Sequence, residues 1–199
     1  MKLGRYALAV ALAVLLIAAP SAAAVEFHSE GANTTIKATQ ITTQQFFFDT
    51  GEFKCSKASA SEFVNPTTWS TLTLHPGFSS CTSFGFTAAV AMNDCSYLIH
   101  IGGTFDIQCP AGKVAEFSSV FCTVTVSSQT GLKSYSHTNL GFGSSRTVIL
   151  HFGATGVDYE EHGVLCENGT EQTDNGVFGG SIELRGFTAG GVQRGIWIS

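Results

Sequence analysis

The chain has 199 residues, of which 44% are hydrophobic and 13% are charged, and its 15 acidic residues outnumber its ten basic ones, giving a formal net charge of −5 at pH 7. Such an acidic surface repels phosphate backbones, and Lys and Arg form no cluster that would overcome the repulsion. The composition therefore argues against nucleic acid and anionic membranes as partners.

The first 24 residues have the pattern of a secretory signal peptide, because Lys2 and Arg5 precede an apolar run over residues 6–19 and small residues follow it up to Ala24. The apolar run is shorter than the roughly 20 residues that a membrane-spanning helix needs, and no later run is as long. We predict cleavage after Ala24 and a secreted, extracytoplasmic mature chain without a membrane span. Removing Lys2 and Arg5 changes the net charge from −5 to −7.

After the signal peptide the chain is rich in Thr, Ser, Gly and Phe, which favour strands and turns over helices, and no window shows an apolar period of 3.6 residues. The residues Gly, Pro, Asn, Asp and Ser separate short apolar or alternating runs at 35–41, 46–48, 53–55, 69–74, 84–92, 97–101, 105–109, 114–117, 121–126, 147–152, 156–160, 177–184 and 192–198. This pattern predicts an all-β fold, a disulfide-stabilised antiparallel β-sandwich or barrel-like fold with little or no helix.

The run of three phenylalanines at 46–48 cannot place all its rings on one side of a strand, because side chains alternate between the two faces. At least one ring must leave the main core.

All six cysteines lie in the predicted mature chain, at positions Cys55, Cys81, Cys95, Cys109, Cys122 and Cys166. An even number of cysteines in an exported chain predicts three disulfides. Zinc is the competing interpretation, but the spacing contains neither a C-x-x-C nor an H-x-x-x-H pattern. We therefore expect disulfides and no committed metal ligand among the cysteines.

One hairpin can be predicted to the level of its register, in the segment from Cys95 to Cys109. A two-residue turn at Gly102-Gly103 would mix apolar and polar side chains on both faces. A three-residue turn that also includes Ile101 sets Ile99 opposite Phe105 and Cys95 opposite Cys109, with apolar residues on one face. Directly opposed residues are close enough for a disulfide, so this register predicts a Cys95–Cys109 bridge.

The sequence does not choose among the pairings of the other four cysteines. Cys55 with Cys81 and Cys122 with Cys166 are the pairings to consider first, the former because these cysteines are neighbours in the sequence.

We expect a single all-β domain over residues 25–199. An alternative is two small β subdomains, 25–110 and 111–199, separated near Pro110. The first part would hold four cysteines and the second two, so the cysteine count does not choose between the two interpretations, and we prefer one domain.

The strongest candidate for chemistry is a row of three side chains, Asp158, Glu160 and His162. Residues two apart on a strand face the same way, so two carboxylates and an imidazole would share one face, and two of them could bind one metal ion. The alternative is a solvated strand face that turns at Gly163, with Tyr159 pointing inward.

A second candidate is calcium on an acidic turn that contains Glu167, Glu171 and Asp174, although its spacing does not match an EF-hand loop.

The sequence contains no nucleophile elbow, phosphate-binding loop or other catalytic motif, so we assign no catalytic residue and expect no cofactor. We expect a secreted or cell-envelope binding or structural module, monomeric by default, whose partner is an unknown extracellular ligand or envelope component. The alternative is a secreted hydrolase, metal-dependent or not, with a site assembled from loop residues and anchored by the Asp158, Glu160 and His162 row. A third interpretation is an anionic structural protein of the cell surface that associates with itself.

Overall fold

The computed structural model describes residues 25–199, apart from positions 50, 134, 165 and 167–169, and for residues 170–174 it describes the backbone alone. The predicted signal peptide, residues 1–24, lies outside the described residues. In the described part, no helix is long and apolar enough to cross a membrane.

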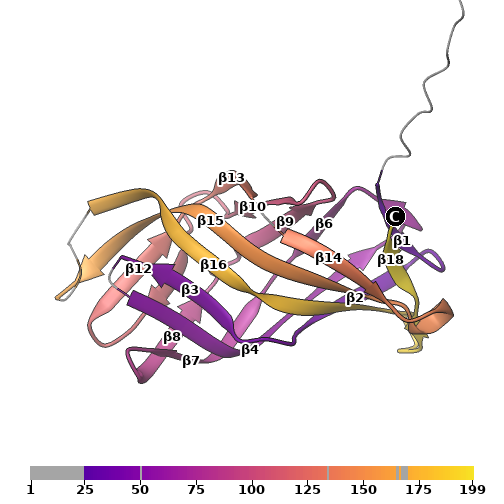
Figure 1. The fold of residues 1–199 in the computed structure, drawn as a ribbon, viewed down its shortest axis with the longest axis horizontal. Coiled ribbons are helices and arrows are strands. Elements are labelled where there is room, and N and C mark those ends of the chain that lie inside the picture. The colour runs from indigo at the N-terminus through magenta and orange to yellow at the C-terminus, as the bar shows by residue number, and fades with distance from the viewer. Residues whose placement is uncertain (1–24, 50, 134, 165, 167–169) are drawn as a thin grey trace, which may run out of the picture.

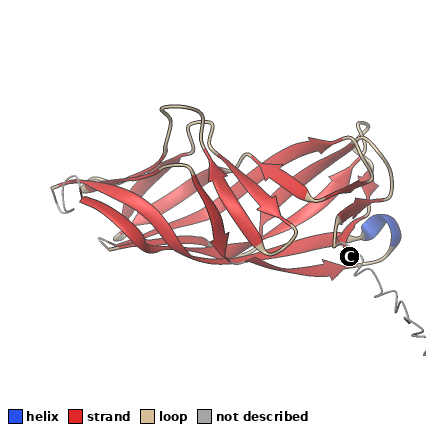
Figure 2. Ribbon diagram, turned by 90° about the horizontal axis from the view of Figure 1, so that it is seen from above, coloured by secondary structure: helices blue, strands red, loops and turns tan. Residues whose placement is uncertain are grey.

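The molecule is elongated (Figures 1 and 2), and its main feature is an antiparallel sheet of eight strands that closes into a barrel. Going round the ring, the strands are β15 (Thr147–Gly163), β12 (Cys122–Val126), β11 (Ala115–Ser118), β8 (Phe86–Ala91), β7 (Gly77–Ser83), β4 (Gly51–Val64), β2 (Thr34–Gln40) and β16 (Thr170–Phe187). The ring closes at β15, which pairs with β16 along one edge and with β12 along the other.

Two strands share one place in the ring, between β4 and β16. Strand β3 (Gln44–Phe48) pairs with residues 51–55 of β4, and β2 pairs with residues 59–64 of the same strand. Strands β14 (Tyr135–Leu140) and β17 (Gln193–Arg194) extend the sheet beyond the ring, alongside β15 and β16. The 3-10 helix η1 (Gly143–Ser145), blue in Figure 2, is the only helical element in the described residues.

Two small sheets complete the fold. One has the strand order β13 (Gln129–Lys133), β10 (Thr104–Gln108), β9 (Ser96–His100) and β6 (Thr71–Leu74). The other has the order β18 (Ile196–Ile198), β1 (Phe27–Ser29) and β5 (Thr68–Trp69), and it brings the start of the described chain beside its C-terminus.

Aromatic side chains fill the space between these sheets and inside the barrel. Phe178 of β16 stacks on Phe46 of β3 with ring centres 4.7 Å apart, and it also meets Phe152 at 5.3 Å and Tyr97 at 5.8 Å. Phe105 of β10 joins the same cluster through Phe152 and Phe178. The small sheet that contains β9 and β10 is therefore packed on the barrel through aromatic rings, which bury more apolar area than any other side chains.

The predicted all-β fold with little helix is confirmed, and of the two expected architectures the sheet adopts the closed one. Strands β4, β15 and β16 are much longer than expected. The runs at 147–152 and 156–160 belong to one strand, β15, because its pairing with β16 continues past the glycines between them, where Gly153 faces Gly179. Strand β7 was not expected, since its Ser-rich sequence has little apolar character, but pairing on both edges places it in the ring.

The outward ring of the phenylalanine run is Phe47, which is 40% exposed, while Phe46 and Phe48 are buried. This alternation follows the two faces of strand β3.

The register predicted for the β9–β10 hairpin is confirmed, with Ile99 opposite Phe105 and Tyr97 opposite Ile107. The structure joins Cys95 to Cys109 at the open end of this hairpin, with Cα atoms 4.1 Å apart. The other two disulfides are Cys55–Cys81, which links directly opposed residues of β4 and β7, and Cys122–Cys166.

Replacing both Cys95 and Cys109 by Ala should lower the free energy of unfolding by about 3 kcal/mol, because this disulfide closes a loop with a sequence separation of 14. Urea unfolding of the oxidised proteins measures the difference. The pair Cys55→Ala and Cys81→Ala, which opens a longer loop of 26, is the comparison and should lose slightly more. An unchanged stability, or a peptide map that pairs Cys95 with another cysteine, would contradict this account.

Candidate functional site

The predicted row Asp158, Glu160 and His162 lies on the outer face of strand β15. Tyr159 and Glu161 between them point into the barrel and are only 2% and 1% exposed. Glu160 and His162 contact each other through Oε1 and Nε2 at 3.2 Å, and nearly half of each side chain is exposed. This arrangement is that of a solvated strand face, with Tyr159 inward.

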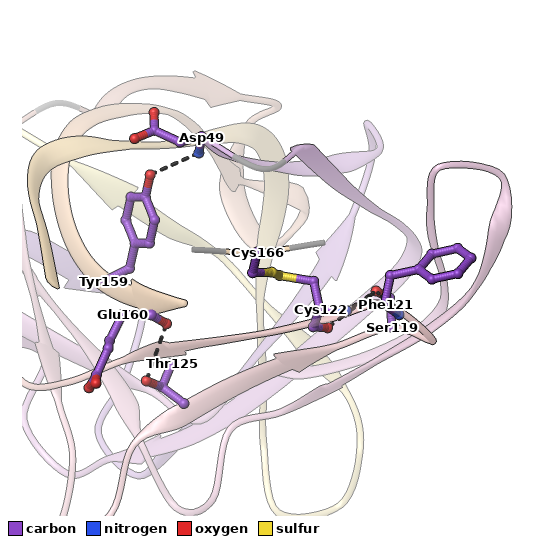
Figure 3. The surroundings of a disulfide bond; sticks show 8 residues. All are labelled: Asp49, Ser119, Phe121, Cys122, Thr125, Tyr159, Glu160 and Cys166. Atoms are coloured by element: carbon purple, nitrogen blue, oxygen red, sulfur yellow. Dashed lines mark hydrogen bonds between the residues drawn. A yellow bond between two sulfur atoms is a disulfide. The ribbon is translucent and has the colours of Figure 1, made fainter. Parts of the chain in front are cut away.

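Neighbouring strands hold the backbone of this row in place. The Gln129 side chain donates to the Asp158 carbonyl oxygen and accepts from the Asp158 N–H, both at 2.9 Å, so it acts as a short piece of an extra strand. The Thr125 hydroxyl donates to the Glu160 carbonyl oxygen at 3.5 Å (Figure 3). The residues Val114, Thr125, Ser127, Asp158, Tyr159 and Glu160 line a hollow of about 90 Å³ beside the row.

Among the described residues, no three His, Cys, Asp or Glu side chains lie close enough together to hold a metal ion. Metal binding by two members of the row together with a further ligand stays a prediction. In the predicted calcium turn, Glu167 and the side chains of Glu171 and Asp174 lie outside the described residues, so that hypothesis also stays a prediction.

Beside the row, the Cys122–Cys166 disulfide ties the start of β12 to the segment that follows β15 (Figure 3). Nearby, the Tyr159 hydroxyl accepts a hydrogen bond from the Asp49 N–H at 2.8 Å and so holds the end of β3 against β15. Burial raises the pKa of Tyr159 to about 12, which keeps the hydroxyl protonated at neutral pH.

The interior of the barrel is tightly packed in the described part of the chain. Two cavities of the described core are each of about 20 Å³, and their walls are almost wholly apolar. A cavity of this size holds about one water molecule. Rings of Phe46, Phe105 and Phe178 occupy the space that a ligand would need.

One polar pair was not predicted as a site. His100 of β9 contacts Asp106 of β10, with Nε2 and Oδ2 2.9 Å apart, and the other carboxylate oxygen of Asp106 accepts the Gly131 N–H at 2.8 Å. The Tyr135 hydroxyl donates to the His100 carbonyl oxygen. The predicted hairpin register already placed His100 and Asp106 on one face, two residues apart across the strands, and that diagonal spacing is the signal that could have identified them.

The environment of Asp106 favours its charged form. Burial of the carboxyl group opposes ionisation, but the hydrogen bond from Gly131 and the His100 imidazole outweigh it, and the pKa of Asp106 lies below its ordinary value of 3.8. The pair thus fixes the orientation of a half-exposed imidazole on the outer side of the β9–β10 hairpin.

Replacing Asp106 by Asn should lower the free energy of unfolding at pH 7 by about 1–2 kcal/mol, because the amide keeps an acceptor for Gly131 but loses the charge. A carboxyl group with a lowered folded pKa stabilises fully above its unfolded pKa and loses that effect as the pH falls through the folded value. The gap between the two proteins should therefore close below pH 3.8. Urea titrations from neutral to acidic pH measure it, and a gap that persists in acid would contradict the assignment.

Together these features define the class as a disulfide-rich all-β barrel protein with a filled interior. Comparison with known proteins finds no matching family model, no similar curated protein and no similar solved structure.

Proposed function

We propose that this protein is an exported binding or structural module that acts through its outer surface. The observation that carries the proposal is the filled barrel, in whose described core two apolar cavities are each about 20 Å³. Carrier proteins built on closed sheets hold their ligand inside, in cavities of several hundred Å³. With the interior packed by aromatic rings, the outer surface and the ends of the barrel are what this chain offers to a partner.

Three disulfides support an oxidising, extracytoplasmic location for this module. The signal-peptide pattern of residues 1–24 adds export across a membrane. The partner is an extracellular ligand or a component of the cell envelope. Residues 25–199 act as one domain, since each half of the chain supplies four consecutive strands of the ring and the halves are joined where β8 pairs with β11 and β2 pairs with β16.

Benzene tests whether the interior is filled. The wild-type protein should not bind it, whereas Phe178→Ala should open an apolar cavity that does, and should lower the free energy of unfolding by about 3–5 kcal/mol. Ligand-detected NMR and urea unfolding measure the two effects. Phe47→Ala is the matched control, because the Phe47 ring is 40% exposed, and it should change stability by less than about 1 kcal/mol without benzene binding. Uptake of benzene or a larger apolar ligand by the wild type would reject the proposal.

A secreted hydrolase is the second candidate, and the contact between Glu160 and His162 beside a 90 Å³ hollow is the observation that favours it. The double variant Asp158→Ala with His162→Ala distinguishes the two functions. A surface module keeps its fold and its partner binding in this variant, because nearly half of the His162 side chain is exposed and the row faces solvent. Loss of a hydrolytic activity with an unchanged thermal unfolding curve would instead establish the hydrolase.

A further inference from the structure

The topology brings four hairpin turns to one end of the barrel. They connect β3 to β4, β7 to β8, β11 to β12, and β15 to β16. The registers place them side by side, since Phe53 of β4 faces Ser83 of β7 and Cys122 of β12 faces Gly163 of β15. We refer to this group of turns as the hairpin end.

Large apolar side chains project from three of these turns into solvent. Phe84 is 58% exposed, Phe86 51%, Val120 68% and Val164 91%. Phe121 is half-buried, and its ring meets that of Phe86 edge-on at 5.4 Å. Figure 3 shows the Phe121 ring pointing away from the Cys122–Cys166 disulfide. These five residues, the apolar tip, come from segments far apart in the sequence and gather at the hairpin end.

Backbone groups of the turns under the tip are hydrogen-bonded within the protein. Ser119 donates its N–H to the Cys122 carbonyl oxygen at 2.8 Å, and its hydroxyl oxygen accepts the N–H groups of Phe121 and Cys122. The Val164 N–H donates to the Phe121 carbonyl oxygen at 3.1 Å. A loop enters an apolar medium only when such groups are satisfied internally. The described residues of these three turns also contain no charged side chain, and Glu167 of the β15–β16 connection lies outside the described residues.

The turn between β7 and β8 has a strained backbone. Phe84 and Gly85 form a two-residue turn with positive φ values of 52° and 81°. Such turns favour Asn-Gly, and a phenylalanine in the left-handed region is unfavourable. The chain nevertheless places a large ring at the outermost point of this hairpin, where its far edge lies against Gly51.

We propose that the apolar tip inserts shallowly into an electrically neutral lipid bilayer. The inference rests on the proposed function, since it assigns the hairpin end as the part of the outer surface that meets a partner. A convex group of rings and valines on rigid turns suits a soft, deformable surface, and shallow burial of apolar side chains is how proteins bind to a bilayer interface without spanning it.

Area and charge favour this partner over others. The tip exposes on the order of 400 Å² of apolar surface, whereas each side of a stable protein dimer buries about 800 Å². The strands below the tip carry acidic side chains such as Asp49 and Glu160, Lys54 there is paired with Glu52 at 2.7 Å, and the whole chain has a net charge of −5. Anionic lipids would be repelled, so the bilayer is a neutral one and the binding is driven by apolar burial.

Flotation with phosphatidylcholine vesicles tests the proposal, using the mature protein with its three disulfides intact. The tip variant combines Phe84→Asn with Val120→Asp. Asn suits the turn better than Phe, and Val120 is 68% exposed, so the fold should keep its thermal stability. The matched control combines Phe63→Asn with Val192→Asp, at residues 53% and 67% exposed and away from the hairpin end.

The wild type should float with the vesicles. The partition coefficient of the tip variant should be lower by about tenfold or more, and that of the control should stay within about twofold of the wild-type value. Added salt should change wild-type binding little, and anionic lipid should weaken it. No flotation of the wild type, or an equal loss in tip and control variants, overturns the proposal. Self-association in sedimentation that only the tip variant abolishes also overturns it, in favour of a second copy as the partner. None of these outcomes bears on the filled interior, which the benzene experiment tests separately.

Discussion

Packing of aromatic rings inside a closed sheet is the constraint on which the rest of this structure depends. A ring of eight strands leaves an interior that side chains must fill, and Phe46, Phe105 and Phe178 fill it while joining the β9–β10 sheet to the barrel. The same rings remove the interior as a place for a ligand. The disulfides then fix the borders of the packed region, at the open end of the β9–β10 hairpin, between β4 and β7, and beside the hairpin end.

Because the core is filled, a partner must bind at the surface, and the side chains of the surface differ from one region to another. The side of β15 carries Glu160 and His162 in contact with each other and with solvent. The β9–β10 hairpin carries a more ordered pair, because Asp106 is largely buried and is held by Gly131 as well as by His100. The apolar tip at the hairpin end, by contrast, exposes aromatic rings and valines. Polar groups on the flanks and apolar rings at one tip are the distribution expected of a molecule that meets another surface end-on.

The sequence was most informative where pairing is local. The β9–β10 hairpin could be predicted with its disulfide because a single turn decides which residues face each other. Strand β7 and the long strands β15 and β16 could not, because non-local partners stabilise them and neither Ser-rich nor Gly-containing segments show an apolar period. The solvated face of Asp158, Glu160 and His162 followed from strand alternation. The gathering of Phe84, Val120 and Val164 did not, since it depends on which turns share one end of the ring.

The pairing of β12 with β15 closes the ring, so a measurement of this pairing tests the closed barrel most directly. NMR of the mature protein should show cross-strand contacts that join Val124 to Glu161 and Thr125 to Glu160, together with slow exchange of the amide protons between these strands. Rapid exchange there, with no contacts between β12 and β15, would mean that the sheet is open and that its aromatic interior is accessible, which would contradict the account.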